Sequence, residues 1–111
     1  MFDIGQGVAQ DYAEAARLNG LAVAQGHVDA QNNLGYLFYQ GQGVAQDYAE
    51  AVRLYGLAAA QGYVDAQNNL GYMLEFGQGV AQDRAEAIRW YRLAAAQGNA
   101  IAQSSLKRLG A

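Results

Sequence analysis

The sequence lacks cysteine and proline altogether, contains a single histidine and has few charged residues. Without cysteine there can be no disulfide framework, no thiolate nucleophile and no cysteine-based zinc site. The absence of proline suits a chain that is mostly helical, because proline interrupts helices. Only 15% of the residues are charged and 52% are hydrophobic, so the composition argues against a disordered chain.

Basic charge and long apolar runs are also scarce. Lys+Arg number 7 and Asp+Glu 10, a net charge of −3, so no basic surface is available for the phosphates of a nucleic acid. Apolar runs such as 57–60 are too short to insert into a membrane. Residues 1–4 lack the basic and apolar stretches of a secretory signal, and the sequence leaves the cellular compartment open. A chain of 111 residues is sufficient for one domain or one short array.

What the sequence has in abundance is repetition. The seven residues Gly-Gln-Gly-Val-Ala-Gln-Asp at 41–47 recur unchanged at 5–11 and at 77–83, a period of 36 residues. Such a period is typical of arrays whose units are single supersecondary elements, each too small to bury a core alone. We therefore interpret residues 1–111 as one array, with a half-unit at 1–26, units at 27–62 and 63–98, and a C-terminal capping helix at 99–111.

The first half of each unit has the pattern of a helix, which we place at about 28–40 in the first complete unit. Its apolar residues share one face of a 3.6-residue period, at Ala30, Leu34, Leu37 and Phe38. Gly35 and its equivalent Gly71 lie in mid-helix, where glycine costs about 1 kcal/mol relative to alanine. We therefore expect a second backbone to approach there too closely for a Cβ. The Gly-x-Gly turn then ends the helix, because glycine accepts a positive φ.

The second half of the unit predicts a helix that opens at Asp47. Asp47 and Glu50 have the spacing of a capping box, in which the aspartate accepts from the backbone near Glu50 and the glutamate reaches back. Glu50 and Arg53 are spaced for an exposed ion pair. Equivalent acids recur at Asp11/Glu14 and Asp83/Glu86. The expected buried stripe is Ala51, Leu54, Tyr55, Ala58 and Ala59.

One complete unit reads Ala-x-x-x-Leu-Gly, a Gly-x-Gly-Val-x-x-Asp turn, and Glu-Ala-x-x-Trp-Tyr-x-x-Ala-Ala-x-Gln-Gly. This pattern resembles the Sel-1-like repeat, a tetratricopeptide-like helical hairpin, and the resemblance covers essentially the whole chain. Phe38 and Leu74 stand where the family usually has tyrosine, Leu18 and Leu54 replace its tryptophan, and Asn19 replaces the next tyrosine. The matching residues are Ala66, Leu70, Gly71, Gly77, Gly79, Val80, Asp83, Glu86, Ala87, Trp90, Tyr91, Ala94, Ala95, Gln97 and Gly98.

The resemblance implies an all-α fold, a right-handed α/α superhelix (solenoid) of Sel-1-like hairpins. We expect six helices: a lone second-type helix at 11–25, two complete hairpins, and a lone first-type helix at 101–109. Residues 1–4 are interpreted as the tail of a further first-type helix. Lys107 and Arg108 replace the equivalents of Gly71 and Tyr72, which is typical of a cap that faces solvent.

The N-terminal helix has no such polar substitution. It keeps Tyr12, Leu18, Leu21 and Val23, so we expect an uncovered apolar surface there. This surface suggests a head-to-tail or helix-exchanged homo-oligomer as one hypothesis.

The residues that could carry chemistry have simpler explanations. The Gly-x-Gly turn lacks the strand and the lysine of a phosphate loop. Asp47 and Glu50 recur in each unit, as helix caps do and active sites do not. His27 occupies a turn or N-cap position, and Trp90 is expected in the core. Ser104 and Ser105 have no nearby His or Lys. We therefore predict no catalytic, cofactor-binding or metal-binding residue.

The remaining candidate is a surface. If the hairpins stack as in tetratricopeptide arrays, the first helices line a concave face whose positions follow from that likeness. Asparagine there offers a donor and an acceptor to a peptide backbone, and tyrosine offers rigid contact area. An unused hydrated groove is the alternative, and Asp29 and Asp65 could simply favour the helix dipole. The predicted partner-binding residues are Asp29, Asn32, Tyr36, Tyr39, Gln40, Asp65, Asn68, Tyr72, Glu75, Phe76 and Arg108, with Ser104 beside them.

The function we expect is a non-catalytic scaffold or adaptor that binds a peptide or protein in this groove. The resemblance implies such roles, commonly in bacterial proteins and in assemblies at or near membranes. A self-assembling or engineered repeat unit is the alternative. A remote alternative is binding or hydrolysis of β-lactams, to which some cysteine-rich relatives have been linked, but this chain has no cysteine. We expect no cofactor, no nucleic-acid partner and no membrane insertion.

Overall fold

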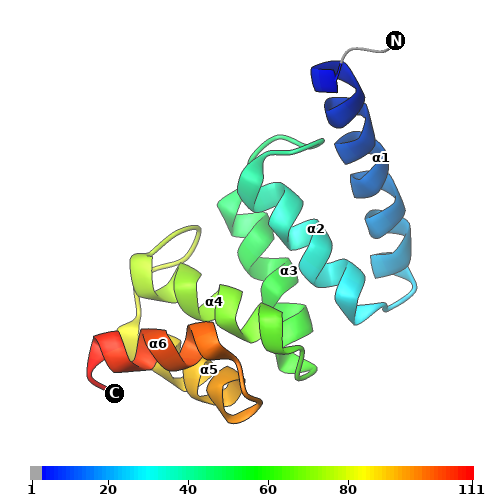
Figure 1. Cartoon of the computed structure of the whole chain (residues 1–111). Coiled ribbons are helices and arrows are strands. Elements are labelled where there is room, and N and C mark those ends of the chain that lie inside the picture. Colours follow the sequence, from blue (N-terminus) through cyan, green and yellow to red (C-terminus); the bar gives the residue numbers. More distant parts are fainter. Residues whose placement is uncertain (1–3) are drawn as a thin grey trace.

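The computed structural model describes the backbone of residues 4–111 and the side chains from residue 12 onward. Within that range the chain forms helices and no strand, which confirms the all-α prediction (Figure 1). No helix among these residues is long and apolar enough to cross a bilayer. The helices are α1 (Ile4–Ala24), α2 (Val28–Gln40), α3 (Tyr48–Ala60), α4 (Val64–Phe76), α5 (Arg84–Ala96) and α6 (Ala100–Leu109).

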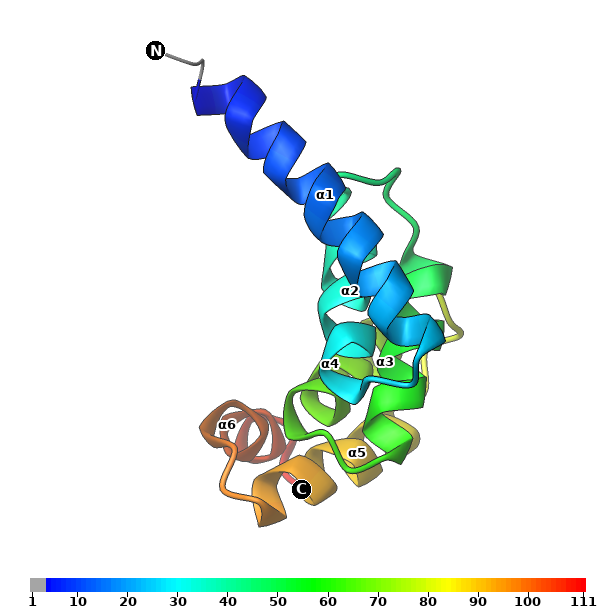
Figure 2. The same ribbon diagram turned by 90° about the vertical axis from the view of Figure 1, so that its right-hand side faces the viewer.

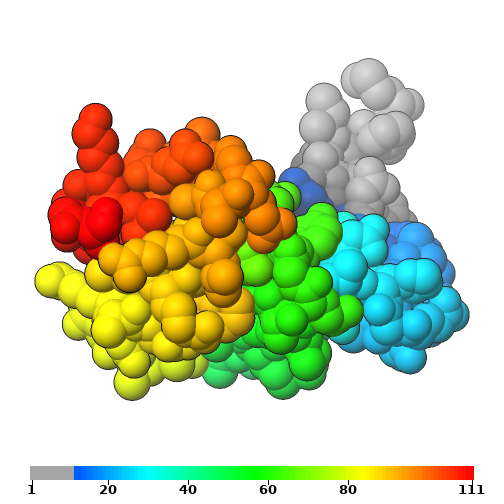
Figure 3. Space-filling model, turned by 90° about the horizontal axis from the view of Figure 1, so that it is seen from below, coloured from blue at the N-terminus to red at the C-terminus, as the bar shows by residue number. Residues whose placement is uncertain are grey.

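The helices stack in chain order, and the main contacts join each helix to the next. Figure 2 shows α2, α4 and α6 along one side of the stack and α3 and α5 along the other. The units follow one another as neighbouring blocks of surface in Figure 3. The radius of gyration is 14.9 Å, whereas a compact domain of this length has about 13 Å. The molecule is therefore an elongated array.

The start of α3 confirms one half of the predicted capping box. The Asp47 side chain accepts a hydrogen bond from the Glu50 N–H at 3.1 Å, and Asp83 repeats this bond in the next unit. The reciprocal bond was wrongly predicted. The Asp47 N–H donates instead to the Phe38 carbonyl at 2.9 Å, so it needs no side-chain partner, and the Glu50 carboxylate pairs with Arg53 as expected.

The glycine turns end the first helices and also hold the units together. Gly41 caps α2 with φ 71° and donates its N–H to the carbonyl of Leu37 at 2.8 Å. Gly43 has φ 77°, and a Cβ on it would collide with the backbone of Tyr12 in helix α1. Gly79 meets the backbone of Tyr48 in the same way. Each turn therefore rests on the previous second-type helix, in the middle of α1 for Gly43 and at the start of α3 for Gly79.

The first copy of the repeated motif behaves differently. Helix α1 begins at Ile4 and runs without a break through residues 5–11, so the predicted helix start and cap at Asp11 are wrong. In the other two copies the turn ends a preceding helix and rests on a preceding unit. In the first copy the same seven residues join the helix that follows. Most of the predicted helix tail at 1–4 lies outside the described residues.

The core confirms the predicted stripe of α3, in which every member is at most 2% exposed. A close approach at the mid-helix glycines is confirmed, but the prediction that a second backbone makes it is wrong, because the close neighbour at both positions is an aromatic ring. A Cβ on Gly35 would lie 2.9 Å from the ring of Tyr55 and 3.4 Å from the carbonyl oxygen of Ala51, and one on Gly71 would lie 2.8 Å from Tyr91. Glycine therefore leaves room for the rings of Tyr55 and Tyr91 against the first helices of their hairpins.

The remaining local predictions concern single positions. His27 is the N-cap of α2, without a side-chain hydrogen bond. Trp90 is half-buried and packs against the core, with the guanidinium of Arg89 4.5 Å from the ring centre. Helix α6 begins one residue earlier than expected, and its N-cap Asn99 accepts from the N–H of Ala102 at 2.8 Å.

Candidate functional site

A row of aromatic rings crosses from α2 to α4. The ring of Tyr39 stacks on Tyr48 at 5.3 Å and meets the edge of Tyr72 at 6.5 Å, and Tyr72 contacts Phe76 at 4.8 Å. Three large rings remain open to solvent, with exposed fractions of 49% for Tyr36, 41% for Tyr72 and 50% for Phe76. Rings that pack in a row and yet stay half exposed form a preorganised apolar surface.

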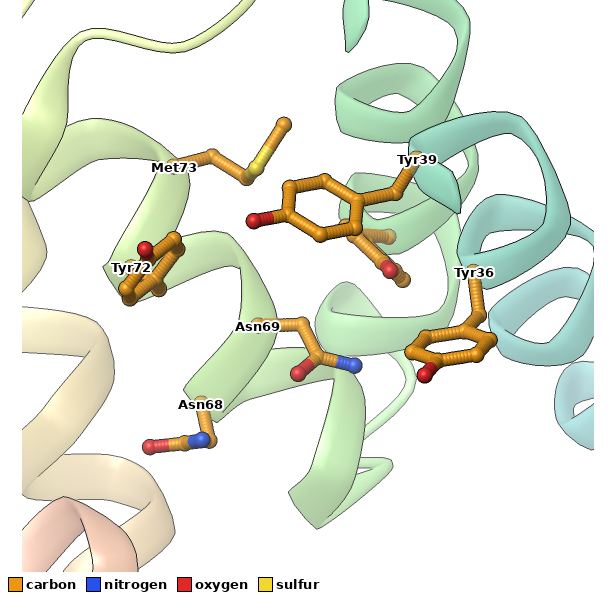
Figure 4. A pocket seen from close by; sticks show the side chains of 7 residues that line it. Tyr36, Tyr39, Asn68, Asn69, Tyr72 and Met73 are labelled. Carbon is orange, nitrogen blue, oxygen red and sulfur yellow. The ribbon is translucent and has the colours of Figure 1, made fainter. Parts of the chain in front are cut away.

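A pocket of about 190 Å³ opens within this row. Figure 4 shows Tyr39 pointing from α2 toward α4, where Tyr72 and Asn69 lie. The buried side chains of Tyr55 and Met73 close its base. Burial raises the pKa of Tyr55, and burial together with the Tyr72 hydroxyl raises that of Tyr39, so both phenols stay neutral. The lining residues are Tyr36, Tyr39, Tyr55, Asn68, Asn69, Tyr72 and Met73.

Two asparagines supply hydrogen-bonding groups at this pocket. The amide of Asn69 donates to the Oδ1 of Asn32 at 3.1 Å, which links α4 to α2. Asn32 is itself buried, so its role is to join the two helices. The Oδ1 of Asn68 is buried and has no hydrogen-bond partner. A neutral pocket with amide groups in its wall suits polar, uncharged groups such as a peptide backbone.

An equivalent pocket lies one repeat toward the N-terminus, and we call each such pocket between neighbouring units a notch. Subtracting the 36-residue period from the lining positions leads to Asn19, Asn32, Asn33, Tyr36 and Leu37. All five line a second pocket of about 310 Å³ between α1 and α2. Asn19 there takes the place of Tyr55, so this notch lacks the aromatic base.

One repeat toward the C-terminus, an ion pair occupies the equivalent position. Glu75 is 3% exposed, and its carboxylate accepts from the Tyr91 hydroxyl at 2.8 Å and from both terminal nitrogens of Arg108 at 2.6 and 2.8 Å. The hydrogen bonds from Arg108 hold the pKa of Glu75 below its usual range. The Arg108 guanidinium also lies 5.9 Å from the ring centre of Phe76. The structure thus brings Glu75 and Arg108 together, but as partners of each other.

The other predicted residues lie along the exposed faces of α2, α4 and α6. Asp29 and Asp65 are exposed in the first turns of α2 and α4. Gln40 donates to the Tyr36 hydroxyl at 3.3 Å, and Ser104 is exposed on α6. Sequence reasoning missed the pocket residues Tyr55, Asn69 and Met73, because Tyr55 was assigned to the buried stripe and the other two were left unassigned. One feature of the sequence could have pointed to Asn69, namely its position next to the predicted residue Asn68.

The arrangement offers contact surface and hydrogen bonds. Among the residues described by the structure, no group of three His, Cys, Asp or Glu side chains is placed to hold a metal ion. The hydroxyls and amides of the pocket have no adjacent general base.

Stacked helical hairpins place this chain in the class of α/α solenoid repeat proteins. The Sel1 repeat pattern matches residues 1–27, 28–63 and 64–99, and the chain belongs to the Sel1 repeat family. Proteins of this family are generally scaffolds for protein–protein interaction. No curated protein matches the chain.

Three solved structures illustrate the relationship. A Sel1 repeat protein from Oxalobacter formigenes is 39% identical over 91% of this chain and 40% of its own, with a TM-score of 0.85. The antigen c5321 of uropathogenic Escherichia coli, which has the same repeat fold, is 47% identical over 77% of this chain and 18% of its own, with a TM-score of 0.76. Cysteine rich protein B of Helicobacter pylori is 21% identical over 91% and 93%, with a TM-score of 0.74, and shows the fold alone. The chain thus spans less than half of the first two.

Proposed function

We propose that this chain is a non-catalytic scaffold that binds an extended peptide segment of a partner protein in the groove between α2 and α4. The observation that carries the proposal is the packed, half-exposed rings of Tyr72 and Phe76 together with the half-exposed ring of Tyr36, beside the amide-lined pocket. Aromatic anchors in a preformed cleft supply most of the affinity in many interfaces.

The exposed rings set the scale of the affinity. An aromatic side chain has about 200 Å² to bury, so a half-exposed ring has about 100 Å² left, worth about 2.5 kcal/mol at 25 cal/mol per Å². Three such rings supply about 7.5 kcal/mol before the costs of association. We therefore expect affinities weaker than micromolar, since a Kd of 1 μM corresponds to about 8 kcal/mol.

The middle notch is favoured over its two equivalents. The notch beside α1 has Asn19 at its base in place of a tyrosine, which leaves less aromatic surface. The third is closed by the ion pair of Glu75 and Arg108. In this proposal Glu75 does not contact the partner; it holds Arg108 against Phe76 and so forms the end of the groove.

The test is a selection of random linear peptides on the immobilised chain, followed by affinity measurements on purified variants. The double variant Tyr36→Ala/Tyr72→Ala should weaken the selected peptides at least tenfold. The matched control is Leu57→Ala/Leu93→Ala, which removes exposed apolar side chains from α3 and α5 instead. Equal losses in both variants, or no loss in the first, would refute groove binding, provided circular dichroism shows that both variants fold.

Self-association is a second candidate, favoured by the outer face of α1. Leu18 and Leu21 are 51% and 53% exposed, whereas Leu54, the equivalent of Leu18 in α3, is 0% exposed. An uncovered second-type helix of this kind has the surface on which a first-type helix packs elsewhere in the array.

The two terminal helices also depart from the repeat in a complementary way. Inside the array a glycine of the first helix faces a tyrosine of the second, as in Gly71 and Tyr91. At the equivalent positions α6 has the large Lys107 and α1 has the small Asn19. If α6 of one copy packed on α1 of another, the exchange of large and small side chains would conserve the volume at the contact.

Sedimentation separates this candidate from groove binding. Leu18→Glu/Leu21→Glu should abolish self-association and leave peptide affinity unchanged, and Tyr36→Ala/Tyr72→Ala should do the reverse. A wild-type chain that sediments only as a monomer at high concentration would rule out self-association.

A further inference from the structure

Helices α2 and α4 present the same order of side chains along their exposed faces. Positions three, four and seven residues apart lie on one side of a helix. Going from the N-terminal end, the order on each face is a carboxylate, then an amide, then an aromatic ring. Helix α4 carries Asp65, Asn69, Tyr72 and Phe76, and helix α2 carries Asp29, Asn33 and Tyr36. The groove between them therefore has an acidic end and an aromatic end.

The two carboxylates at the acidic end are available to a ligand. Asp29 and Asp65 are exposed, and the salt bridges of the described residues involve other acids. On the neighbouring first-type helix α6, Arg108 is already bound by Glu75. A ligand that complements this groove carries positive charge at one end and apolar surface at the other.

Helix α6 marks where the groove stops. Ile101 stands at the position of Asp65, and Arg108 stands at the position of Tyr72. The order of acid and ring is therefore lost on α6, and the pattern is confined to α2 and α4.

The helix geometry fixes the distance between the two ends. Asp65 and Tyr72 are seven residues apart, which corresponds to a rise of about 10.5 Å along the helix. An extended peptide advances about 3.1–3.3 Å per residue, so three steps cover about 9–10 Å. A basic residue at the carboxylates and an apolar residue at the tyrosines thus fit when two residues lie between them.

We propose that the groove prefers extended peptides in which a large apolar residue and a Lys or Arg are separated by two residues. This preference rests on the proposed function and adds the chemistry of its ligand. The apolar side chain enters the pocket that Tyr36, Tyr39 and Tyr72 line, and the ligand backbone passes the asparagines. The ammonium or guanidinium group lies near Asp29 and Asp65.

The test uses labelled peptides with one Trp and one Lys in a Gly/Ser background, in both orders, with binding followed by fluorescence anisotropy. The better of the two orders should bind about fivefold more tightly than its Lys→Gln counterpart, since exposed ion pairs are weak. It should also bind more tightly than peptides in which the two residues are adjacent. Added salt should reduce the advantage of lysine.

Variants of the protein assign the effect to the groove. Asp29→Asn/Asp65→Asn should abolish the preference for Lys over Gln, and Tyr36→Ala/Tyr72→Ala should weaken both peptides. Glu14→Gln/Glu86→Gln removes the same charge from α1 and α5, away from the groove, and should leave the preference intact. Since Asp29 and Asp65 also favour the dipoles of their own helices, the melting temperature of each variant is measured beside its affinity.

The outcomes separate the two proposals. If Lys and Gln peptides bind equally, or if the Glu14/Glu86 control removes the preference as well, the inference about the ligand is wrong. Groove binding still stands in that case when the tyrosine variant lowers affinity. If wild type binds neither order more tightly than the tyrosine variant does, both proposals fail.

Discussion

Replacing Gly71 with alanine sets two effects of known size against each other. Alanine is favoured over glycine in a helix by about 1 kcal/mol. The added Cβ would lie 2.8 Å from Cε1 and 2.9 Å from Cδ1 of Tyr91. Tyr91 is almost fully buried, and its hydroxyl donates to Glu75, so the ring cannot move aside easily. Overpacking of this kind costs about 1–3 kcal/mol. After the gain of about 1 kcal/mol from alanine is subtracted, we expect a net loss of up to about 2 kcal/mol.

The control for Gly71→Ala lies on a neighbouring helix. A Cβ on Gly56, in the middle of α3, would meet nothing within 4 Å. Gly56→Ala should therefore stabilise the protein by up to about 1 kcal/mol. Gly35→Ala should be milder than Gly71→Ala, because the ring of Tyr55 has no carboxylate holding its hydroxyl.

Urea and thermal unfolding followed by circular dichroism would measure the series. For a domain of this size 1 kcal/mol corresponds to a change of about 4 °C in Tm. The reasoning predicts Gly56→Ala above wild type and Gly71→Ala below it. A Gly71→Ala variant as stable as Gly56→Ala would show that the ring relaxes freely, and the packing argument would then be wrong.

Three further predictions concern charges and caps. Arg108 lowers the pKa of Glu75 in the folded protein, so the stability that the Glu75 carboxylate contributes is complete above its ordinary pKa and is lost as the pH falls through its pKa in the folded state. Glu75→Gln should therefore make Tm depend less on pH in the acidic range. Arg108→Ala leaves the buried carboxylate of Glu75 without its cation and should lower the midpoint of urea unfolding, whereas Arg17→Ala, at an exposed pair, should leave the midpoint almost unchanged. Asp47→Ala should lower the unfolding free energy by about 1 kcal/mol through the lost helix cap, and Glu50→Gln by only a few tenths, since the Glu50 side chain pairs with Arg53 and does not cap. Equal losses in urea unfolding would show that Glu50 does cap the helix.

The helices and the buried stripe could be predicted from the sequence because their signals are local. Asp47 and Gly41 mark the ends of helices through their own conformational preferences, and Ala51 to Ala59 follow one helical face. The Glu75–Arg108 pair could not be predicted, because it joins residues 33 positions apart on different helices. Periodicity placed Glu75 on the exposed face, whereas the bond from Tyr91 draws its carboxylate inward.

The pocket illustrates a second limit of the sequence. Tyr55 was correctly predicted to be buried, yet the same ring forms the base of the pocket. A pattern of apolar positions tells which residues leave solvent, but it does not tell which of them will underlie a cleft between neighbouring units. That depends on how far apart α2 and α4 lie, and the close contact of Gly35 with Tyr55 helps to set their packing.

One 36-residue period thus produces three different surfaces, because each notch depends on residues from two units. Tyr55 and Tyr72 make the middle notch aromatic, Asn19 makes the first one polar, and the Glu75–Arg108 pair closes the third. The repeated motif shows the same dependence in the backbone, since residues 5–11 are helical while 41–47 form a turn against the unit before them. In such an array a few substitutions at the boundaries between units are sufficient to give one groove its own chemistry while the hairpins stay the same. The differences between the units, more than their shared pattern, should therefore decide what this chain binds.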